Sequence, residues 1–292
     1  MSVVIDIAPE RPKAGTATPP SRQRWRDPVP GFGLTLGLSL AWLGAVVLLP
    51  LAALVLRSFD LGLDGWWQLL QSERVQSALW LSFSTAVLAA GIASVVGTLL
   101  AWVLVRYRFP GRRLMDAMVD LPFALPTAVA GIALTALYSG TGWVGQFLEP
   151  QGIVIAQRPA GIVLALVFIG LPFTVRTLQP ILQTATREFE EAAATLGASR
   201  WTIVRRVVFP PLLPALLTGF SLAFARGLGE YGSVIFIAGN IPFVSEIAPL
   251  LIVIRLEEFD YAGATGIATL MLLMSFLTLL ALSLLQRKTR HG

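Results

Sequence analysis

The stretch GLTLGLSLAWLGAVVLLPLAALVL, residues 33–56, contains no charged side chain. A helix needs about 20 predominantly apolar residues to cross the ~30 Å hydrocarbon core of a bilayer, and this stretch is longer than that. A helix or strand at the surface of a soluble core would interrupt the apolar run with polar residues at a regular period. The stretch therefore predicts a membrane-spanning helix.

Five more apolar blocks follow, at about 78–105, 117–138, 160–182, 212–238 and 264–285. Of the 292 residues, 55% are hydrophobic and only 13% are charged, against about 25% charged in ordinary soluble domains. We therefore expect an all-α, polytopic membrane protein with about six transmembrane helices in residues 31–292. Residues 1–30 are rich in Pro, Ala, Thr and Arg and have no apolar run, which predicts a disordered cytoplasmic tail instead of a cleaved signal peptide.

Prolines interrupt the third and fourth blocks. Pro122 and Pro126 lie in the third, and Pro172 and Pro180 in the fourth. Proline in a membrane helix frees a backbone carbonyl, which is tolerable only where protein or a water-filled cavity satisfies it. We expect these two helices to lie inside the bundle, near a pathway or an interface.

Basic residues are distributed unevenly between the connections, which predicts the orientation. They gather before the first span, after the second, after the fourth and after the sixth: Arg11, Lys13, Arg22, Arg24, Arg26, Arg106, Arg108, Arg112, Arg113, Arg176, Arg187, Arg200, Arg205, Arg206, Arg287, Lys288 and Arg290. The other side holds only Arg57, Arg74, Arg158 and Arg255. The positive-inside rule then places both termini in the cytoplasm. It also accounts for the net charge of +5 without any nucleic-acid partner.

The composition excludes several kinds of site. The chain has no cysteine, and its one histidine, His291, is next to the last residue. A thiolate metal site, a cysteine nucleophile and a Ser-His-Asp triad are therefore excluded. We expect no metal, no cofactor and no catalytic residue.

A polar segment of about thirty residues separates the fourth and fifth spans and predicts two short helices. Thr186 can cap a first helix whose opening turn holds Glu188, Glu190 and Glu191, where acids oppose the positive end of the helix dipole. Gly197 can end that helix. Ser199 can cap a second helix, which runs through Arg206 and which we expect Pro210 to end.

This segment, about 187–210, resembles the EAA loop of binding-protein-dependent ABC permeases. It contains Glu191-Ala192-Ala193, then Gly197, then Val207-x-Phe209-Pro210, where the family pattern ends in Ile-x-Leu-Pro. The resemblance implies a MetI-like permease core in which the loop docks on a separate ATPase subunit. The residues that it assigns to this contact are Glu190, Glu191, Ala192, Ala193, Gly197, Ala198, Ser199 and Arg200.

Further segments resemble sulfate/thiosulfate permeases, and the T-type more than the W-type. They are LPFALPTAVAG at 121–131, RGLGEYGSVIFIAGN at 226–240, SEIAPL at 245–250 and LEEFDY at 256–261. The resemblance implies an importer in the bacterial inner membrane. In it, this chain would pair with a W-type permease, two copies of an ATPase and a periplasmic sulfate-binding protein. The chain has no Gly-x-x-x-x-Gly-Lys-Ser/Thr sequence, so we expect the ATPase activity to belong to a partner.

We expect Arg226 and Glu230 to be the only charges well inside a span. Their i, i+4 spacing lets them neutralise each other on one helix face. Such a pair could border the translocation pathway or only fix helix packing, and the second reading is favoured because a satisfied pair has little charge left for an anion. Pro122, Pro126, Gly229 and Asn240 belong to the same group of pathway or packing candidates.

Two rival functions remain. Molybdate or tungstate permeases share the Gly-Glu-aromatic-Gly and Ala-Gly-Asn elements of this chain, and their substrate has the charge and shape of sulfate. An ion-coupled secondary transporter would need a proton or sodium site near the membrane midplane, and the EAA-type segment would then have no role.

Overall fold

The computed structural model describes residues 31–184 and 187–290, so the predicted tail, Thr186 and His291 lie outside the described residues. The structure divides into two units, Met1–Leu51 and Ala52–Gly292. All described elements are helical, which confirms the predicted all-α class. In chain order they are α1 (Phe32–Leu43), the π-helical η1 (Gly44–Leu48), α2 (Leu49–Ser58), the 3-10 turn η2 (Phe59–Leu61), α3 (Gly62–Gln71), α4 (Glu73–Arg106), α5 (Arg112–Val119), α6 (Leu121–Ala124), α7 (Thr127–Tyr138), α8 (Gly145–Leu148), the 3-10 turn η3 (Glu149–Gln151), α9 (Pro159–Thr184), α10 (Arg187–Thr195), α11 (Arg200–Ile203), the π-helical η4 (Val204–Val208), α12 (Phe209–Leu228), α13 (Val234–Ala238), α14 (Ala248–Glu257) and α15 (Tyr261–Arg290).

Five helical segments among the described residues are long and apolar enough to cross a membrane, where the sequence predicts about six. They are Phe32–Gln71, Glu73–Arg106, Pro159–Thr184, Arg200–Leu228 and Tyr261–Gln286. The apolar helix α7 is shorter. The first, second, fourth and sixth predicted spans are therefore confirmed, whereas the third and fifth need correction.

The predicted third span, 117–138, is not one helix but parts of α5, α6 and α7. The break falls at Leu125, whose backbone is extended with φ −87° and ψ 135°, directly before Pro126. A proline ring disfavours the helical conformation in the residue before it, and proline has no N–H to continue the helix. The 12 residues of α7 span about 18 Å, which is less than the hydrocarbon thickness.

The predicted fifth span, 212–238, is displaced toward the N-terminus. One helix runs from Arg200 to Leu228 through α11, η4 and α12, so Pro210 does not end the second helix of the polar segment, as the sequence predicted. The chain passes this proline through a π turn, in which the Phe209 N–H donates to the Val204 carbonyl. The wider turn accommodates a residue that cannot donate a hydrogen bond. At its other end the helix stops at Gly229.

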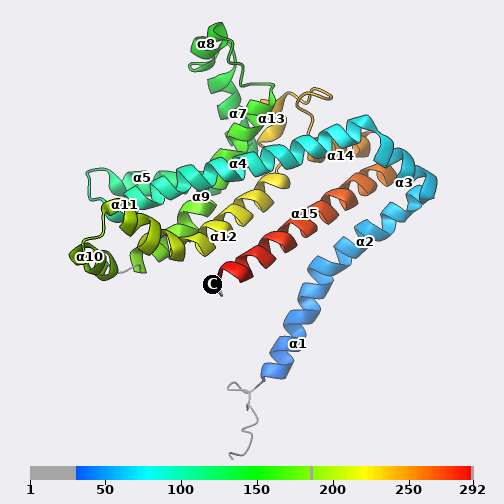
Figure 1. Ribbon diagram of the computed structural model, residues 1–292. Coiled ribbons are helices and arrows are strands. Elements are labelled where there is room, and N and C mark those ends of the chain that lie inside the picture. Colours follow the sequence, from blue (N-terminus) through cyan, green and yellow to red (C-terminus); the bar gives the residue numbers. More distant parts are fainter. Residues whose placement is uncertain (1–30, 185–186, 291–292) are drawn as a thin grey trace, which may run out of the picture. The chain divides into compact units, whose positions relative to one another are not determined.

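Helices α4, α9 and α12 lie side by side and form the centre of the second unit (Figure 1). All three helices pack tightly around Thr174 of α9, whose side chain is fully buried. A Cβ added to Gly97 of α4 would lie 2.8 Å from the Thr174 Cβ, and one added to Gly219 of α12 would lie 3.0 Å from the Thr174 Cα. Small residues at helix crossings of this kind permit close packing in a membrane.

Three apolar clusters follow one another along this bundle. The middle cluster includes Ala89, Leu166 and Phe224 of the three central helices. A second cluster joins α5 to the end of α9 and to η4. A third joins α3, α14 and the start of α15 to the first turns of α4. The polar segment 187–210 therefore sits at the end of the bundle that the second cluster holds together.

Candidate functional site

The turn at Gly197 joins α10 to α11 in the way that the sequence predicts. Gly197 has φ +82°, a left-handed conformation that glycine adopts without steric cost. The Ala198 N–H donates to the Ala193 carbonyl (3.0 Å) and the Gly197 N–H to the Ala194 carbonyl (2.9 Å). These two bonds form a Schellman motif, which satisfies carbonyls that the end of a helix would otherwise leave free. We call residues 187–206 the knuckle.

The predicted cap of the second helix is also confirmed. The Ser199 hydroxyl accepts a hydrogen bond from the Thr202 N–H at 3.2 Å and lies 2.8 Å from the Thr202 hydroxyl. A serine at this position typically stabilises a helix by about 1 kcal/mol. The knuckle is therefore a short helix, a left-handed turn and the capped start of the long helix that reaches Leu228.

The outer surface of the knuckle is only partly polar. Glu191, Ala192, Gly197, Ser199 and Arg200 are exposed, while Ala193 and Ala198 are half-buried. Next to them, the large side chains of Leu196 and Trp201 are 88% and 71% exposed. Exposed apolar side chains beside smooth alanine and glycine surface are typical of a contact with another protein.

Glu190 turns inward and pairs with Arg106 at the end of α4. Arg106 is 11% exposed and stacks over the Trp102 ring at 5.3 Å. One of the acids that the sequence assigned to the partner contact is therefore already paired within the chain. The ion pair attaches α10 to α4 across 84 residues of sequence.

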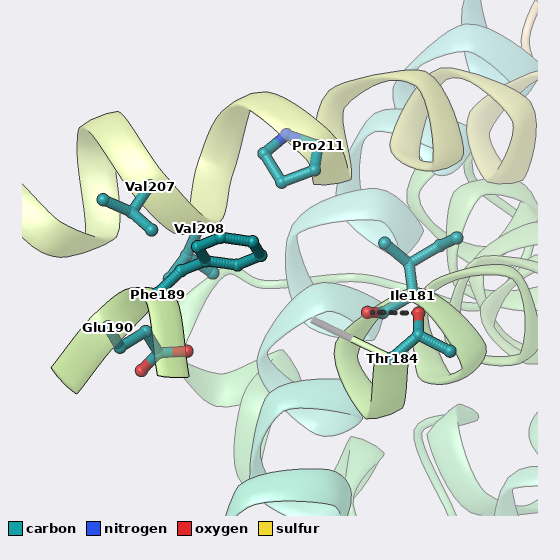
Figure 2. Close-up of a pocket in the computed structure, with 7 residues that line it drawn as sticks. All are labelled: Ile181, Thr184, Phe189, Glu190, Val207, Val208 and Pro211. Carbon is teal, nitrogen blue, oxygen red and sulfur yellow. Dashed lines mark hydrogen bonds between the residues drawn. The ribbon is translucent and has the colours of Figure 1, made fainter. Parts of the chain in front are cut away.

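A small apolar pocket of about 190 Å³ lies behind α10 (Figure 2). Figure 2 shows the Phe189 ring beside Val208, with Ile181 and Thr184 of α9 across the opening. In α10, Glu190 contacts α4 through this ion pair and Phe189 lines the pocket. Both contacts come from the first turn of α10.

Arg226 and Glu230 form the ion pair that the sequence predicts, with 2.5 Å between Nη1 and Oε2. The Glu230 side chain is 2% exposed and that of Arg226 is 36% exposed. Glu230 lies just beyond the end of α12, not inside a span, because the helix stops at Gly229. Its second oxygen, Oε1, accepts hydrogen bonds from the N–H (2.9 Å) and the hydroxyl (3.1 Å) of Ser233. Ser233 was not among the predicted site residues; the available signal was its position three residues after a glutamate, where a serine can close a turn.

The turn at 229–233 packs against the start of α7. A Cβ on Gly131 would lie 2.3 Å from the Ser233 carbonyl oxygen, and one on Gly232 would lie 2.3 Å from the Thr127 hydroxyl oxygen. Pro126 immediately precedes Thr127, so the two helix breaks of the structure meet at this point.

The other two pathway candidates lie elsewhere. Pro122 is the second residue of α6 and is half-buried. Asn240 follows α13 in a left-handed conformation (φ +49°), and its buried amide oxygen has no hydrogen-bond partner among the described residues.

A second intrahelical charge was missed. Arg176 lies inside α9, not in the connection after it, so Arg226 and Glu230 are not the only charges within the predicted spans. Its guanidinium donates to both oxygens of Asp120 (2.7 and 2.5 Å), to Asp116 Oδ1 (2.7 Å) and to Gln179 (2.5 Å). The pKa of the Asp116 carboxyl is lowered, first because the Gln179 amide donates to it and then because Arg176 does. Asp120 within the predicted third span was the available signal, because a charge there needs a partner.

At the opposite end of the bundle, Arg74 and Glu246 form a two-pronged ion pair. The Arg74 Nε and Nη2 atoms donate to the two Glu246 oxygens at 2.8 and 2.7 Å, and the Glu246 side chain is 1% exposed. This pair joins the first turn of α4 to the segment before α14.

Comparisons with known proteins agree with this arrangement. The family described as "Binding-protein-dependent transport system inner membrane component" matches residues 93–291. A sulfate transport system permease protein CysT from Synechocystis is 49% identical over 266 residues, covering 89% of this chain and 93% of that protein. The protein of the same name from Escherichia coli is 46% identical over 263 residues, covering 90% of this chain and 95% of the relative.

Solved structures resemble the fold at low identity. A bacterial ABC transporter that imports the acidic polysaccharide alginate has a chain with a TM-score of 0.74 and 17% identity, covering 88% of this chain and 96% of that one. The methionine ABC transporter MetNI has one with a TM-score of 0.53 and 18% identity, covering 75% of this chain and 99% of that one. With the family match across most of the chain and relatives nearly half identical over most of its length, the chain belongs to the family of binding-protein-dependent transport system inner membrane components.

Proposed function

We propose that this chain is the sulfate-translocating permease subunit of an ATP-driven importer and that the knuckle is its contact with the ATPase. As a member of its family it is an inner-membrane component of an ABC transport system. The names of its relatives support sulfate as the substrate. Labelled sulfate, thiosulfate and molybdate, compared in one uptake assay, would rank the substrates.

The observation that carries the ATPase contact is the exposed pair Leu196 and Trp201 around the turn at Gly197. A Cβ atom added to Gly197 would have no atom of the described chain within 4 Å. Packing within the chain therefore does not require a small residue at this position. The two side chains flank a turn whose geometry is fixed by the Schellman motif and by the Ser199 cap. A rigid turn with uncovered apolar side chains suits insertion into a groove of a partner, because little entropy is lost on binding.

The remaining partners follow from the resemblance and from the family. The chain would pair with a homologous W-type permease, bind two ATPase copies through the two knuckles of the pair, and receive sulfate from a periplasmic binding protein. Transport is then conformational: closure of the ATPases displaces the knuckles and exchanges access between the two faces of the membrane.

The docking is tested with two knuckle variants. Leu196→Asp places a charge where we expect apolar burial, at a cost of several kcal/mol in the complex. Gly197→Asn adds a side chain, and asparagine tolerates the left-handed backbone conformation of this position. Both should reduce ATPase co-purification at least tenfold while the permease still accumulates in the membrane. Sulfate uptake should fall with it.

The matched control is Gly152→Asn, because Gly152 has φ +80° and nothing within 4 Å of its Cβ position. It should retain the ATPase. If Leu196→Asp and Gly197→Asn both keep the ATPase and transport normally, the knuckle is not the docking contact.

A further inference from the structure

The connection between α4 and α5 contains an arginine pocket that none of the contacts described above uses. Arg108, Phe109, Gly111, Arg112 and Arg113 line a cavity of about 340 Å³ at the end of the bundle that carries the knuckle. Three guanidinium groups within six residues make this the most concentrated positive charge on the described loops of that end. A cavity with such a lining is suited to an anion.

No protein acceptor neutralises the pocket in the described part of the chain. The side chains of Arg108, Arg112 and Arg113 take part in none of the hydrogen bonds or ion pairs found there. Asp116, one turn after Arg112, is already held by Arg176 and Gln179. Helix α5 begins at Arg112 with no acidic residue in its first turn and no side-chain cap. Arginines at the positive end of a helix are electrostatically unfavourable unless an anion lies nearby.

Exposed apolar side chains follow the arginines along the same short helix, α5. Leu114 and Met118, at i and i+4 on one face of α5, are 67% and 56% exposed, and Leu121 beyond them is 44% exposed. A soluble anion or an acidic peptide would match the arginines but would leave this apolar stripe uncovered. A phospholipid has both parts that the surface needs, a negative headgroup and hydrocarbon chains.

We propose that the arginine pocket binds the phosphate headgroup of an anionic membrane lipid, whose acyl chains lie along Leu114 and Met118. The site lies close to two attachments of the bundle, because Arg106 holds the knuckle and Asp116 holds Arg176. A bound lipid therefore fixes the corner between α4 and α5 from which both attachments extend. The inference rests on the membrane placement of the family and is independent of the ATPase contact proposed above.

The test uses the full chain purified in mild detergent with its co-expressed subunits. Phosphatidylglycerol and phosphatidylcholine are titrated separately, and retained lipid is counted by native mass spectrometry. We expect tighter binding of phosphatidylglycerol. Arg108→Gln with Arg113→Gln should weaken it at least tenfold, because each basic residue near an anionic surface contributes measurably to binding. The double variant should keep its ATPase.

The control removes the same charge from exposed residues of η4, Arg205→Gln with Arg206→Gln. Because both belong to the knuckle, this control is read by lipid binding alone, and it should retain phosphatidylglycerol. Three results of the lipid measurement would overturn the proposal: equal binding of the two lipids, equal loss in both double variants, or displacement of phosphatidylglycerol by millimolar sulfate or phosphate. The third would identify a site for a free anion. Loss of the ATPase with lipid binding intact would instead make the pocket part of a protein interface, and that would also overturn it.

Discussion

Glu230 has two kinds of contact, an ion pair and hydrogen bonds that close a turn, and both indicate a structural role. One carboxylate oxygen pairs with Arg226 and the other closes the turn through Ser233. This turn packs on α7 so closely that neither Gly131 nor Gly232 has space for a Cβ atom. These contacts favour a packing role over a binding site for a substrate anion.

Substitutions at this pair should therefore have unequal effects. Arg226→Met leaves a carboxylate that is 2% exposed without its cation, at a cost on the order of 3–5 kcal/mol. Glu230→Gln leaves an arginine that is 36% exposed and can reach water or headgroups, so the loss should be smaller. Accumulation in the membrane and sulfate uptake are measured in the same preparations.

The double variant, Arg226→Met with Glu230→Gln, removes both charges and keeps an acceptor for Ser233. It should recover both accumulation and uptake relative to Arg226→Met. A double variant that accumulates normally but does not transport would contradict the packing role and place the pair in the pathway.

At the scale of elements, long apolar runs predicted where most helices lie, because length and composition alone decide whether a segment can cross the bilayer. They could not predict where 117–138 and 212–238 are broken, because both blocks are apolar enough overall to cross a bilayer; Pro126 indicated an interruption of the first block, but composition does not say that the helix ends there. The pairing of Arg176 with Asp116 was not predictable either. The two residues are 60 positions apart in the sequence and come together only because α5 packs on α9. In the knuckle, local signals at Gly197 and Ser199 were sufficient.

The attachment of α10 to α4 should matter for coupling. Arg106→Glu places two carboxylates together and should push α10 away from α4, reducing uptake at least tenfold. Exchange of the charges, Arg106→Glu with Glu190→Arg, should restore a substantial part of it. Uptake and ATPase activity are measured on the same complexes, and an exchange variant no better than either single variant would argue against this attachment.

The crossing of α4 and α9 is also testable. A Cβ at Gly97 would lie 2.8 and 2.9 Å from Thr174 Cβ and Cγ2, so Gly97→Ala should destabilise the chain by about 1–3 kcal/mol. Gly91→Ala is the control on the same helix, because nothing lies within 4 Å of its Cβ position, and it should be neutral or slightly stabilising. The two variants and the parent protein are heated, and the fraction of each that stays monodisperse is measured by size-exclusion chromatography. Equal loss in the two variants would mean that the crossing is looser than the distances indicate.

For the molecule as a whole, the distribution of basic residues predicts one orientation in the membrane. The knuckle and the arginine pocket lie at the same end of the bundle, as the contact of Arg106 with Glu190 shows. We therefore expect both to face the cytoplasm.

Because the chain has no cysteine, single-cysteine labelling can test this orientation without background. Pro110→Cys and Leu196→Cys should react with an impermeant maleimide only after the membrane is opened. Gln151→Cys and Glu257→Cys should react from the periplasm, and all four positions are exposed. Labelling of Leu196→Cys in intact cells would invert the proposed orientation.

The unbroken course from Arg200 to Leu228 gives the knuckle a long lever arm. At about 1.5 Å per residue, 29 helical residues measure about 43 Å, so a 5° tilt about one end moves the other by about 4 Å. That far end is Gly229, where the helix gives way to the turn held by Glu230 against α7. A small rotation of the knuckle would therefore produce a displacement of several ångströms at Gly229, where the turn after α12 meets the start of α7.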